Sequence, residues 1–364
     1  MPNSEIRPPA FLLSPSDWVG RVAQQTGAFT VVEDYEDGTV SISIPPTGNR
    51  IDLHTAFRQN VSARAVLEFG ANRRRSGTTD VQVICTPYIS ERAAELCRNE
   101  NIGYIDRVGN CRISAPGLLV HVSGMPNRPD ADRSQIDVFS HKSSRIVRAL
   151  LSEPTRGWQV QQLAAGAGVS LGLASRVKSA LIEDAYLEER DKRVYLRDAV
   201  RLLQDWAAHD RPPVVPMMLF SLLRPTEIER ELVGWCRDNG FACAVTLLSA
   251  AWQYSPVVRF NSLVAYVDER AVVGPNRAGL LRRIDAREVD SGANCTLWPT
   301  HDRAVFTDSR EIEGVPVVSP LQLYLDLKTL PGRGGEAADE ILRTQLAHLT
   351  TFDGAKSISE SGNE

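Results

Sequence analysis

Basic side chains near the middle of the chain have types and spacing suited to contact with nucleic acid. Arg176 and Lys178 lie in a stretch with helical periodicity, and Arg190, Lys192 and Arg193 surround a polar tip between two short apolar segments. A guanidinium group can donate two hydrogen bonds to a guanine edge or to a phosphate, and an ammonium group binds phosphate as a point charge. These cations therefore predict contact with duplex DNA.

Small and polar side chains accompany the cations at the start of the same helical stretch. Ser170 is a candidate helix cap, and the unpaired N–H groups that follow a cap favour a phosphate. Leu171, Gly172, Ser175 and Ser179 share the face that carries the cations, and small residues let a helix enter the major groove closely. We predict that these residues and the cations together bind DNA.

The elements that must position these residues occupy residues 136–209. Apolar spacing predicts three helices separated by short connections, and the last helix has Ala174, Val177 and Leu181 on its core face. Helix, helix, turn, helix and hairpin, in this order, are typical of a winged helix-turn-helix. The predicted bounds are helices at 139–152, 160–165 and 170–184, a turn at 166–169 and a hairpin at 186–196.

The same segment has an alternative use, as a protein-interaction module or a spacer between domains. Glu188, Glu189 and Asp191 dilute the positive charge of the predicted hairpin. The net charge of the whole chain is −4, and only the middle segment has a small excess of basic residues. Whole-chain charge therefore neither supports nor excludes DNA binding. Only the charge of a local surface can indicate it.

Acidic side chains in the first third of the chain raise a second, enzymatic interpretation. A helix, a β-meander and a further helix–strand pair suit a restriction-endonuclease-like fold, in which Asp52, Glu68, Asp80 and Asp106 would bind Mg²⁺. Such nucleases usually need a lysine to help activate water, and residues 1–135 contain none. We predict a degenerate, non-catalytic version of this fold and no enzymatic activity. A Mg²⁺-dependent nuclease targeted by the winged helix is the alternative.

Three further motifs admit either a structural or a chemical role. Asp106 and Asn110 lie where a strand ends, and we interpret them as closing a hairpin rather than contacting a ligand. The glycine-rich residues 331–335 lack the Lys-Ser/Thr of a phosphate loop, so we place the end of one helix and the start of another there. Asp326 is interpreted as a helix-surface or packing residue rather than a catalytic acid.

The spacing of cysteine and histidine residues argues against a metal site. The six cysteines include no CxxC pair, and the six histidines lie far apart, so we predict no metal and no other cofactor. The N-terminal residues do not resemble a signal peptide, and no apolar run is long enough to span a bilayer. We therefore expect a cytoplasmic protein without a membrane partner.

Two polar or proline-rich joints divide the chain into three blocks, and the expected fold class is multi-domain α/β. In the last block, residues 217–223 are apolar enough for a buried strand, and Thr226 is the expected cap of a helix that ends near residue 239. We also expect a strand at 304–307 and helices at 319–328 and 334–349. The predicted divisions are an N-terminal α/β domain at 1–124, a linker at 125–135, the winged helix at 136–209, a C-terminal α/β domain at 214–350 and a disordered tail at 353–364.

Four motifs that flank the predicted winged helix resemble a known family. They are residues 86–90 (TPYIS), 103–110 (GYIDRVGN), 318–327 (VSPLQLYLDL) and 330–339 (LPGRGGEAAD). In this order they resemble the AbiEi-like antitoxins and transcriptional regulators of bacterial type IV toxin–antitoxin systems, over most of residues 80–345. The simplest such antitoxins begin with a winged helix, whereas this chain begins with an α/β block.

The resemblance implies a transcriptional regulator that represses its own operon. It also implies an antitoxin that counters a neighbouring nucleotidyltransferase-like toxin, often in phage defence. The implied partners are double-stranded operator DNA and the toxin encoded nearby. Paired operator sites would suit a homodimer.

Overall fold

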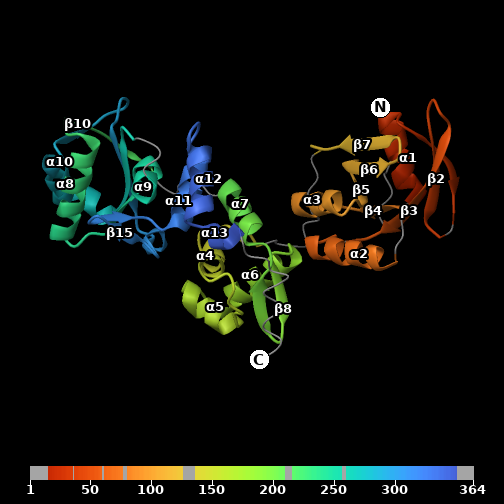
Figure 1. The fold of residues 1–364 in the computed structure, drawn as a ribbon, viewed down its shortest axis with the longest axis horizontal. Helices are drawn as coiled ribbons and strands as arrows, with labels where there is room; N and C mark the ends of the chain where they lie inside the picture. Colours follow the sequence, from red (N-terminus) through yellow and green to blue (C-terminus); the bar gives the residue numbers. More distant parts are fainter. Residues whose placement is uncertain are drawn as a thin grey trace, which may run out of the picture. The chain divides into compact units, whose positions relative to one another are not determined.

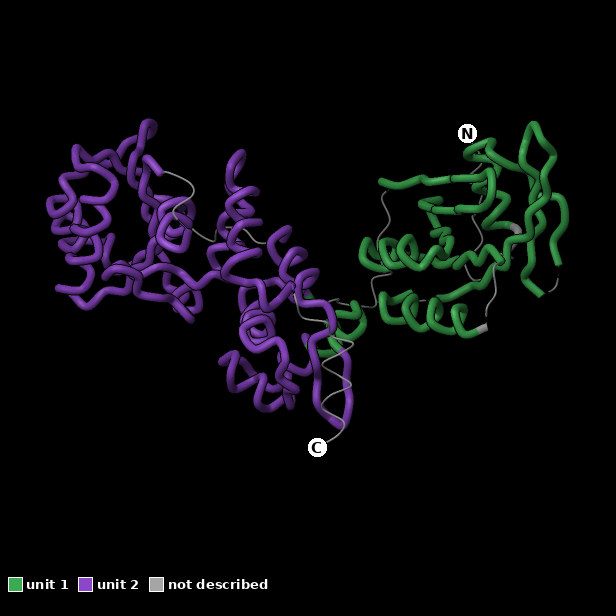
Figure 2. Tube along the Cα trace, in the orientation of Figure 1, with its two compact units in different colours: residues 1–136, 178–187 green, residues 137–177, 188–364 purple. Residues whose placement is uncertain are grey.

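The protein is a mixed α/β protein with two mixed sheets of seven strands and many helices (Figure 1). The computed structural model describes residues 15–35, 37–59, 61–76, 80–125, 136–209, 215–255 and 260–350. The chain divides into two compact units, residues 1–136 with 178–187 and residues 137–177 with 188–364 (Figure 2). The predicted α/β class is confirmed, whereas the predicted tail and nearly all of the predicted linker lie outside the described residues.

The first sheet follows the order of its strands in the chain. Strands β1 to β3 are antiparallel, β3, β4 and β5 are parallel, and β5 to β7 are antiparallel. The parallel strands are those joined by helices, because a parallel connection must cross back over the sheet. The strands are β1 Thr30–Asp34, β2 Thr39–Ile44, β3 Asn49–Phe57, β4 Val81–Thr86, β5 Gly103–Asp106, β6 Cys111–Ala115 and β7 Leu118–Val122.

Each face of this sheet has its own apolar core. Because side chains alternate along a strand, Val83 and Cys85 of β4 join the core that contains α1, while Ile84 joins the core that contains α2 and α3. The three helices are α1 Pro15–Thr26, α2 Ala63–Ser76 and α3 Glu91–Asn99.

The middle of the chain contains the predicted helices and hairpin in the predicted order. The first helix begins at Ser144 rather than at residue 139, because turns precede it; Asp137 Oδ1, for example, accepts the Phe139 N–H at 2.9 Å. The second helix continues to Ala167, two residues beyond its predicted end. The elements are α4 Ser144–Ser152, α5 Val160–Ala167, α6 Leu171–Glu183, β8 Leu187–Arg190, β9 Arg193–Leu196 and α7 Ala199–His209.

The second sheet has the order β13-β10-β14-β12-β11-β16-β15. Figure 1 shows α8 and α10 on one side of it and α9, α11 and α12 on the other. Its strands are β10 Met217–Ser221, β11 Cys243–Thr246, β12 Leu263–Asp268, β13 Ala286–Glu288, β14 Cys295–Thr300, β15 Arg310–Ile312 and β16 Val315–Val317. The helices are α8 Pro225–Asp238, α9 Leu247–Tyr254, α10 Gly274–Arg283, α11 Pro320–Thr329, α12 Gly334–Thr344 and α13 Ala347–Thr350.

Several expectations for this last block are wrong in detail. The strand β10 is buried on one face only, and Met218 and Phe220 on its other face are exposed. Arg224 rather than Thr226 caps α8, because Pro225 occupies the first helical position, where its missing N–H is not needed. The expected helix at 334–349 is interrupted at residues 345–346, so that α12 and α13 are separate.

All six cysteines are free thiols, and only Cys243 among them is not fully buried. Burial raises the pKa of Cys85, Cys97 and Cys295 to about 12, because a thiolate is poorly solvated in the interior.

Within the described ranges, none of the helices has the length and apolar character needed to cross a bilayer.

Candidate nucleic-acid interface

The connection between α5 and α6 is fixed by its backbone. Gly168 ends α5 in the left-handed region, with φ of 62°, where a side chain would be strained. Its N–H and that of Val169 donate to carbonyl oxygens in the last turn of α5. Ser170 Oγ accepts the Leu173 N–H at 3.3 Å, so the predicted cap is confirmed. The two helices are therefore joined by a short, defined turn.

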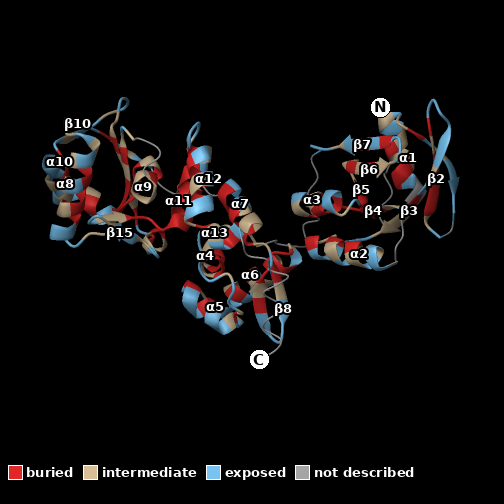
Figure 3. Cartoon of the chain, viewed as in Figure 1, coloured by how far each residue is buried: buried red, intermediate tan, exposed pale blue. Residues whose placement is uncertain are grey.

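Helix α6 has one buried and one exposed face (Figure 3). Ala174, Val177 and Leu181 have exposed fractions of 0%, which confirms the predicted core face. Arg176 is exposed and makes no hydrogen bond or ion pair with the described part of the chain. Of the predicted site residues on this helix, Leu171, Gly172, Ser175, Arg176 and Ser179 are exposed, and Lys178 is half-buried.

The hairpin β8–β9 turns at two residues in the left-handed region, Asp191 with φ of 47° and Lys192 with φ of 62°. Such a turn matches the right-handed twist of the two strands. The predicted cations Arg190, Lys192 and Arg193 are all exposed at this tip, but two of them make internal contacts. Arg190 Nε donates to Glu188 Oε1 at 2.7 Å, and Arg193 Nη1 donates to the Gly157 carbonyl oxygen at 3.0 Å. Lys192 makes no hydrogen bond or ion pair with any described residue.

A third extended segment, before α5, pairs with the hairpin. Trp158 and Val194 exchange two backbone hydrogen bonds, of 2.9 and 2.8 Å. The Trp158 side chain is buried, and the guanidinium of Arg156 lies 3.8 Å from its ring centroid. A Cβ on Gly157 would come within 2.5 Å of the Tyr195 ring, so a side chain at this position would displace that ring. These contacts fix strand β9 of the hairpin to the segment that leads into α5.

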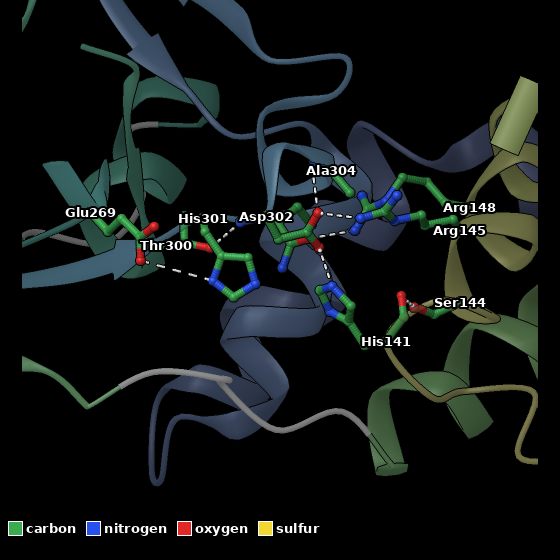
Figure 4. A network of polar contacts seen from close by, with 10 residues as sticks. His141, Ser144, Arg145, Arg148, Glu269, Thr300, His301, Asp302 and Ala304 are labelled. Atoms are coloured by element: carbon green, nitrogen blue, oxygen red, sulfur yellow. Dashed lines mark hydrogen bonds and ion pairs between the residues drawn. The ribbon is translucent and has the colours of Figure 1, made fainter. Parts of the chain in front are cut away.

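An acidic side chain from the C-terminal block anchors the start of α4 (Figure 4). Asp302 Oδ1 accepts from Arg145 Nη2 at 2.8 Å and from the Ala304 N–H at 3.0 Å, and Oδ2 lies 3.5 Å from His141 Nε2. The hydrogen bond to Ala304 starts the short 3₁₀ helix η3 Arg303–Phe306. The strand expected at 304–307 is therefore wrong, because the Asp302 side chain turns the backbone there.

Buried hydrogen bonds connect α4 to α11 and to the second sheet. Arg148 Nη2 donates to Gln322 Oε1, and Gln322 Nε2 donates to Asp326 Oδ1 at 2.8 Å. Asp326 also accepts hydrogen bonds from Tyr266, at 2.9 Å, and from Thr246. Asp326 is only 2% exposed, so it is a packing residue engaged on both oxygens rather than a surface acid. This agrees with one of the two roles that we expected for Asp326, the packing role, and excludes the other, a position on the helix surface.

Sequence reasoning did not find Arg145, Arg148, Asp302 or Gln322. The available signal was weak: Arg148 lies between apolar positions of α4 at a spacing that places it on the core-facing side. A cation at such a position needs a polar partner in the interior. Its partner could not be identified, because Gln322 is 174 residues away in the chain.

The four acids considered for Mg²⁺ binding lie on different elements and contact other residues. Asp52 on β3 accepts a hydrogen bond from a serine of β2, Glu68 pairs with an arginine of α2, and Asp80 lies 3.5 Å from a histidine of β3. Asp106, at the end of β5, accepts the N–H groups of residues 108–110. Among the described residues, no group of three or more His, Cys, Asp or Glu side chains is placed to hold a metal ion.

The other two motifs have structural roles. Asn110 Nδ2 donates to Asp106 Oδ2 at 2.8 Å, and Gly109 has a φ of 100°, so this segment closes the β5–β6 hairpin as expected. In the glycine-rich residues 331–335, the first three lie between the end of α11 at Thr329 and the start of α12, and Gly334 and Gly335 begin α12, again as expected. Neither geometry requires a ligand.

An exposed face of α6 and an exposed hairpin tip therefore both lie within residues 136–209. No family model, no curated protein and no solved structure with which we compared this chain gives a match.

Proposed function

We propose that residues 136–209 form a winged helix-turn-helix that binds duplex DNA, and that the protein is a transcriptional regulator. The observation that carries this proposal is the exposed face of α6, where Arg176 makes no hydrogen bond or ion pair with the described residues, opposite a fully buried core face. A guanidinium group that has no partner within the protein, on a helix packed against a core, can donate hydrogen bonds to a molecule outside the protein. The paired segment at Trp158 and the hairpin β8–β9 support the winged arrangement.

The proposed contacts divide between base edges and the DNA backbone. The first turn of α6 has small side chains at Gly172 and Ser175, which allow close approach to the floor of the major groove. Arg176 would donate to a guanine edge, while the N–H groups near Ser170 would bind a phosphate. Lys192 at the hairpin tip would bind the backbone, where it adds affinity without reading sequence.

For the N-terminal unit, we propose a degenerate restriction-endonuclease-like fold. The order α1, antiparallel β1–β3, α2 and then β4 parallel to β3 supports this layout. The nuclease alternative requires clustered carboxylates near a basic side chain. The candidate acids instead lie on separate elements and contact other residues, which favours the non-catalytic version. The unit would then serve recognition rather than catalysis.

The resemblance to AbiEi-like antitoxins supports a narrower proposal. In it, the protein represses its own operon, binds paired operator sites as a homodimer and counters a nucleotidyltransferase-like toxin encoded next to it, in phage defence. The neighbouring reading frame tests this proposal. A nucleotidyltransferase-like product whose toxicity is relieved by co-expression of this chain is the expected finding, and the absence of such a neighbour would remove the antitoxin role.

Replacement of Arg176 tests DNA binding directly. Arg176→Ala should weaken binding to the DNA upstream of the protein's own gene by about 1–3 kcal/mol and reduce the preference for that DNA over unrelated sequence. The reason is that the variant loses a bidentate donor without disturbing a contact within the described residues. Fluorescence anisotropy with labelled duplexes at fixed salt gives both affinities.

The matched control is Arg287→Ala, which removes an exposed arginine of β13 that also has no hydrogen bond or ion pair among the described residues. This control should bind like the wild type. If Arg176→Ala binds both duplexes as the wild type does, while its circular dichroism is unchanged, α6 is not the recognition helix.

A further inference from the structure

A cavity of about 660 Å³ lies between α4, the end of α5 and residues 301–308, all within one compact unit. Its walls include Arg145 and Arg148 of α4, residues Ala165–Gly168 and the exposed residue Arg303. Part of this wall is visible in Figure 4, where Arg145, Arg148 and Asp302 point toward one another. The volume is in the range of cavities that hold small molecules.

The acidic side chains of this cavity already have partners. Glu153 accepts two hydrogen bonds from Arg156, at 2.9 and 3.0 Å. Asp302 accepts from Arg145, and Asp308 accepts from Ser152 Oγ at 3.2 Å. The charges of Glu153 and Asp302 are therefore offset by arginines, whereas the hydroxyl of Ser152 leaves the charge of Asp308 in place.

One guanidinium group at the same cavity has no partner among the described residues. Arg303 is exposed and makes no hydrogen bond or ion pair with the described residues. Arg145 and Arg148 also line the cavity. Three guanidinium groups at one cavity, one of them without a partner among the described residues, favour an acceptor-rich, negatively charged molecule.

We infer that this cavity binds a small polyanion, a molecule that carries phosphate or several carboxylate groups, with Arg303 as the main contact. The inference goes beyond DNA binding, because the same cavity would bind the anion in the absence of DNA. Its occupant would touch the last turn of α5, immediately before the turn that leads into α6.

Direct binding of two probes to the full chain tests the site. Titration calorimetry with pyrophosphate and with citrate, at constant ionic strength, separates phosphate from carboxylate recognition. We expect at least one probe to bind the wild type. Arg303→Ala should weaken that binding by about tenfold or more, because it removes the charged contact. Ala165→Glu, on an exposed cavity-lining position of α5, should do the same by placing a negative charge in the wall.

Two controls match these changes in charge. Arg287→Ala removes an exposed arginine elsewhere in the same unit, and Gln161→Glu adds an acid to α5 outside the cavity. Both should bind the probe like the wild type, and thermal melting should show that all four variants fold.

Three outcomes would overturn the inference. The first is that neither probe binds the wild type. The second is that the cavity variants and the controls lose affinity equally, which would indicate general charge attraction. The third is that Arg303→Ala weakens DNA binding but not probe binding, which would make the cavity part of the DNA surface. Loss of DNA binding by Arg176→Ala alone leaves the inference intact, so the two proposals fail separately.

Discussion

Individual polar residues hold α4 against the C-terminal block. The side chains of Arg148, Gln322 and Asp326 are connected by hydrogen bonds and are each less than a tenth exposed. Removal of any one of them leaves a buried polar atom without its partner, which costs far more than the net gain from making one hydrogen bond. The polar contacts therefore fix the position of α4 more narrowly than apolar packing alone would.

Glu229 on α8 shows what burial does to an acid with too few partners. Its Oε1 accepts from Gln253 Nε2 at 3.2 Å, but its buried Oε2 has no hydrogen-bond partner in the described part of the chain. Burial raises the pKa of Glu229 from 4.5 to about 7. The folded state therefore keeps a proton that the unfolded state releases between these pH values.

We expect this group to stabilise the fold most below pH 4.5 and to lose that contribution as the pH rises to about 7. Glu229→Gln is neutral at every pH, so its free energy of unfolding relative to the wild type should rise by about 1–3 kcal/mol between pH 5 and pH 8. Urea unfolding at both pH values measures the difference.

Glu336→Gln, at an exposed position of α12, is the matched control for the loss of one carboxylate. A constant difference between Glu229→Gln and the wild type across this range would mean that Glu229 is already ionised in the folded protein at pH 5.

At the scale of secondary-structure elements, the junction of α11 and α12 depends on one glycine. A Cβ on Gly334 would lie 2.4 Å from the Leu327 carbonyl oxygen, whereas a Cβ on Gly335 would meet nothing within 4 Å. Neither residue has a positive φ, so the two neighbours differ in space rather than in backbone strain. They form a natural pair for comparison.

Gly334→Ala should lower the free energy of unfolding by about 1–3 kcal/mol, because the two helices must separate to admit the methyl group. Gly335→Ala should leave it unchanged or raise it by up to about 1 kcal/mol, because alanine favours a helix. Chemical unfolding of both variants decides the matter, and equal effects would show that the junction is not closely packed.

Elements were predictable from the sequence where local pattern determines them. The spacing of Ala174, Val177 and Leu181 predicted the core face of α6, and it is fully buried. The strand expected at 304–307 failed because the side chain of Asp302 caps a 3₁₀ turn there, an effect that apolar periodicity does not reveal. The cavity wall was beyond prediction, since 157 residues separate Arg145 from its partner Asp302.

For the whole molecule, DNA binding must overcome a net charge of −4. Contacts with phosphate release counterions, so affinity should fall steeply with salt even though the net charge opposes binding. Lys192→Ala should weaken binding to all sequences about equally and make the slope of log K against log salt shallower by about one. This single substitution is preferable to one that includes Arg193, because Arg193 donates to the Gly157 carbonyl oxygen.

Arg287→Ala changes the net charge by the same amount away from the hairpin, and its slope should equal that of the wild type. An unchanged slope for Lys192→Ala would mean that the hairpin tip does not touch DNA. The segment 136–209 would then be better understood as a protein-interaction module.

The burial of the native thiols makes the chain suitable for site-directed fluorescent labelling. Thiolates are the species that react with maleimides, and five of the six cysteines are buried. Replacing the half-buried Cys243 by serine would leave only fully buried native thiols, and a cysteine introduced by Lys192→Cys would be exposed at the hairpin tip. Energy transfer from a dye at this position to one on the duplex would then report the distance between the hairpin and DNA in solution.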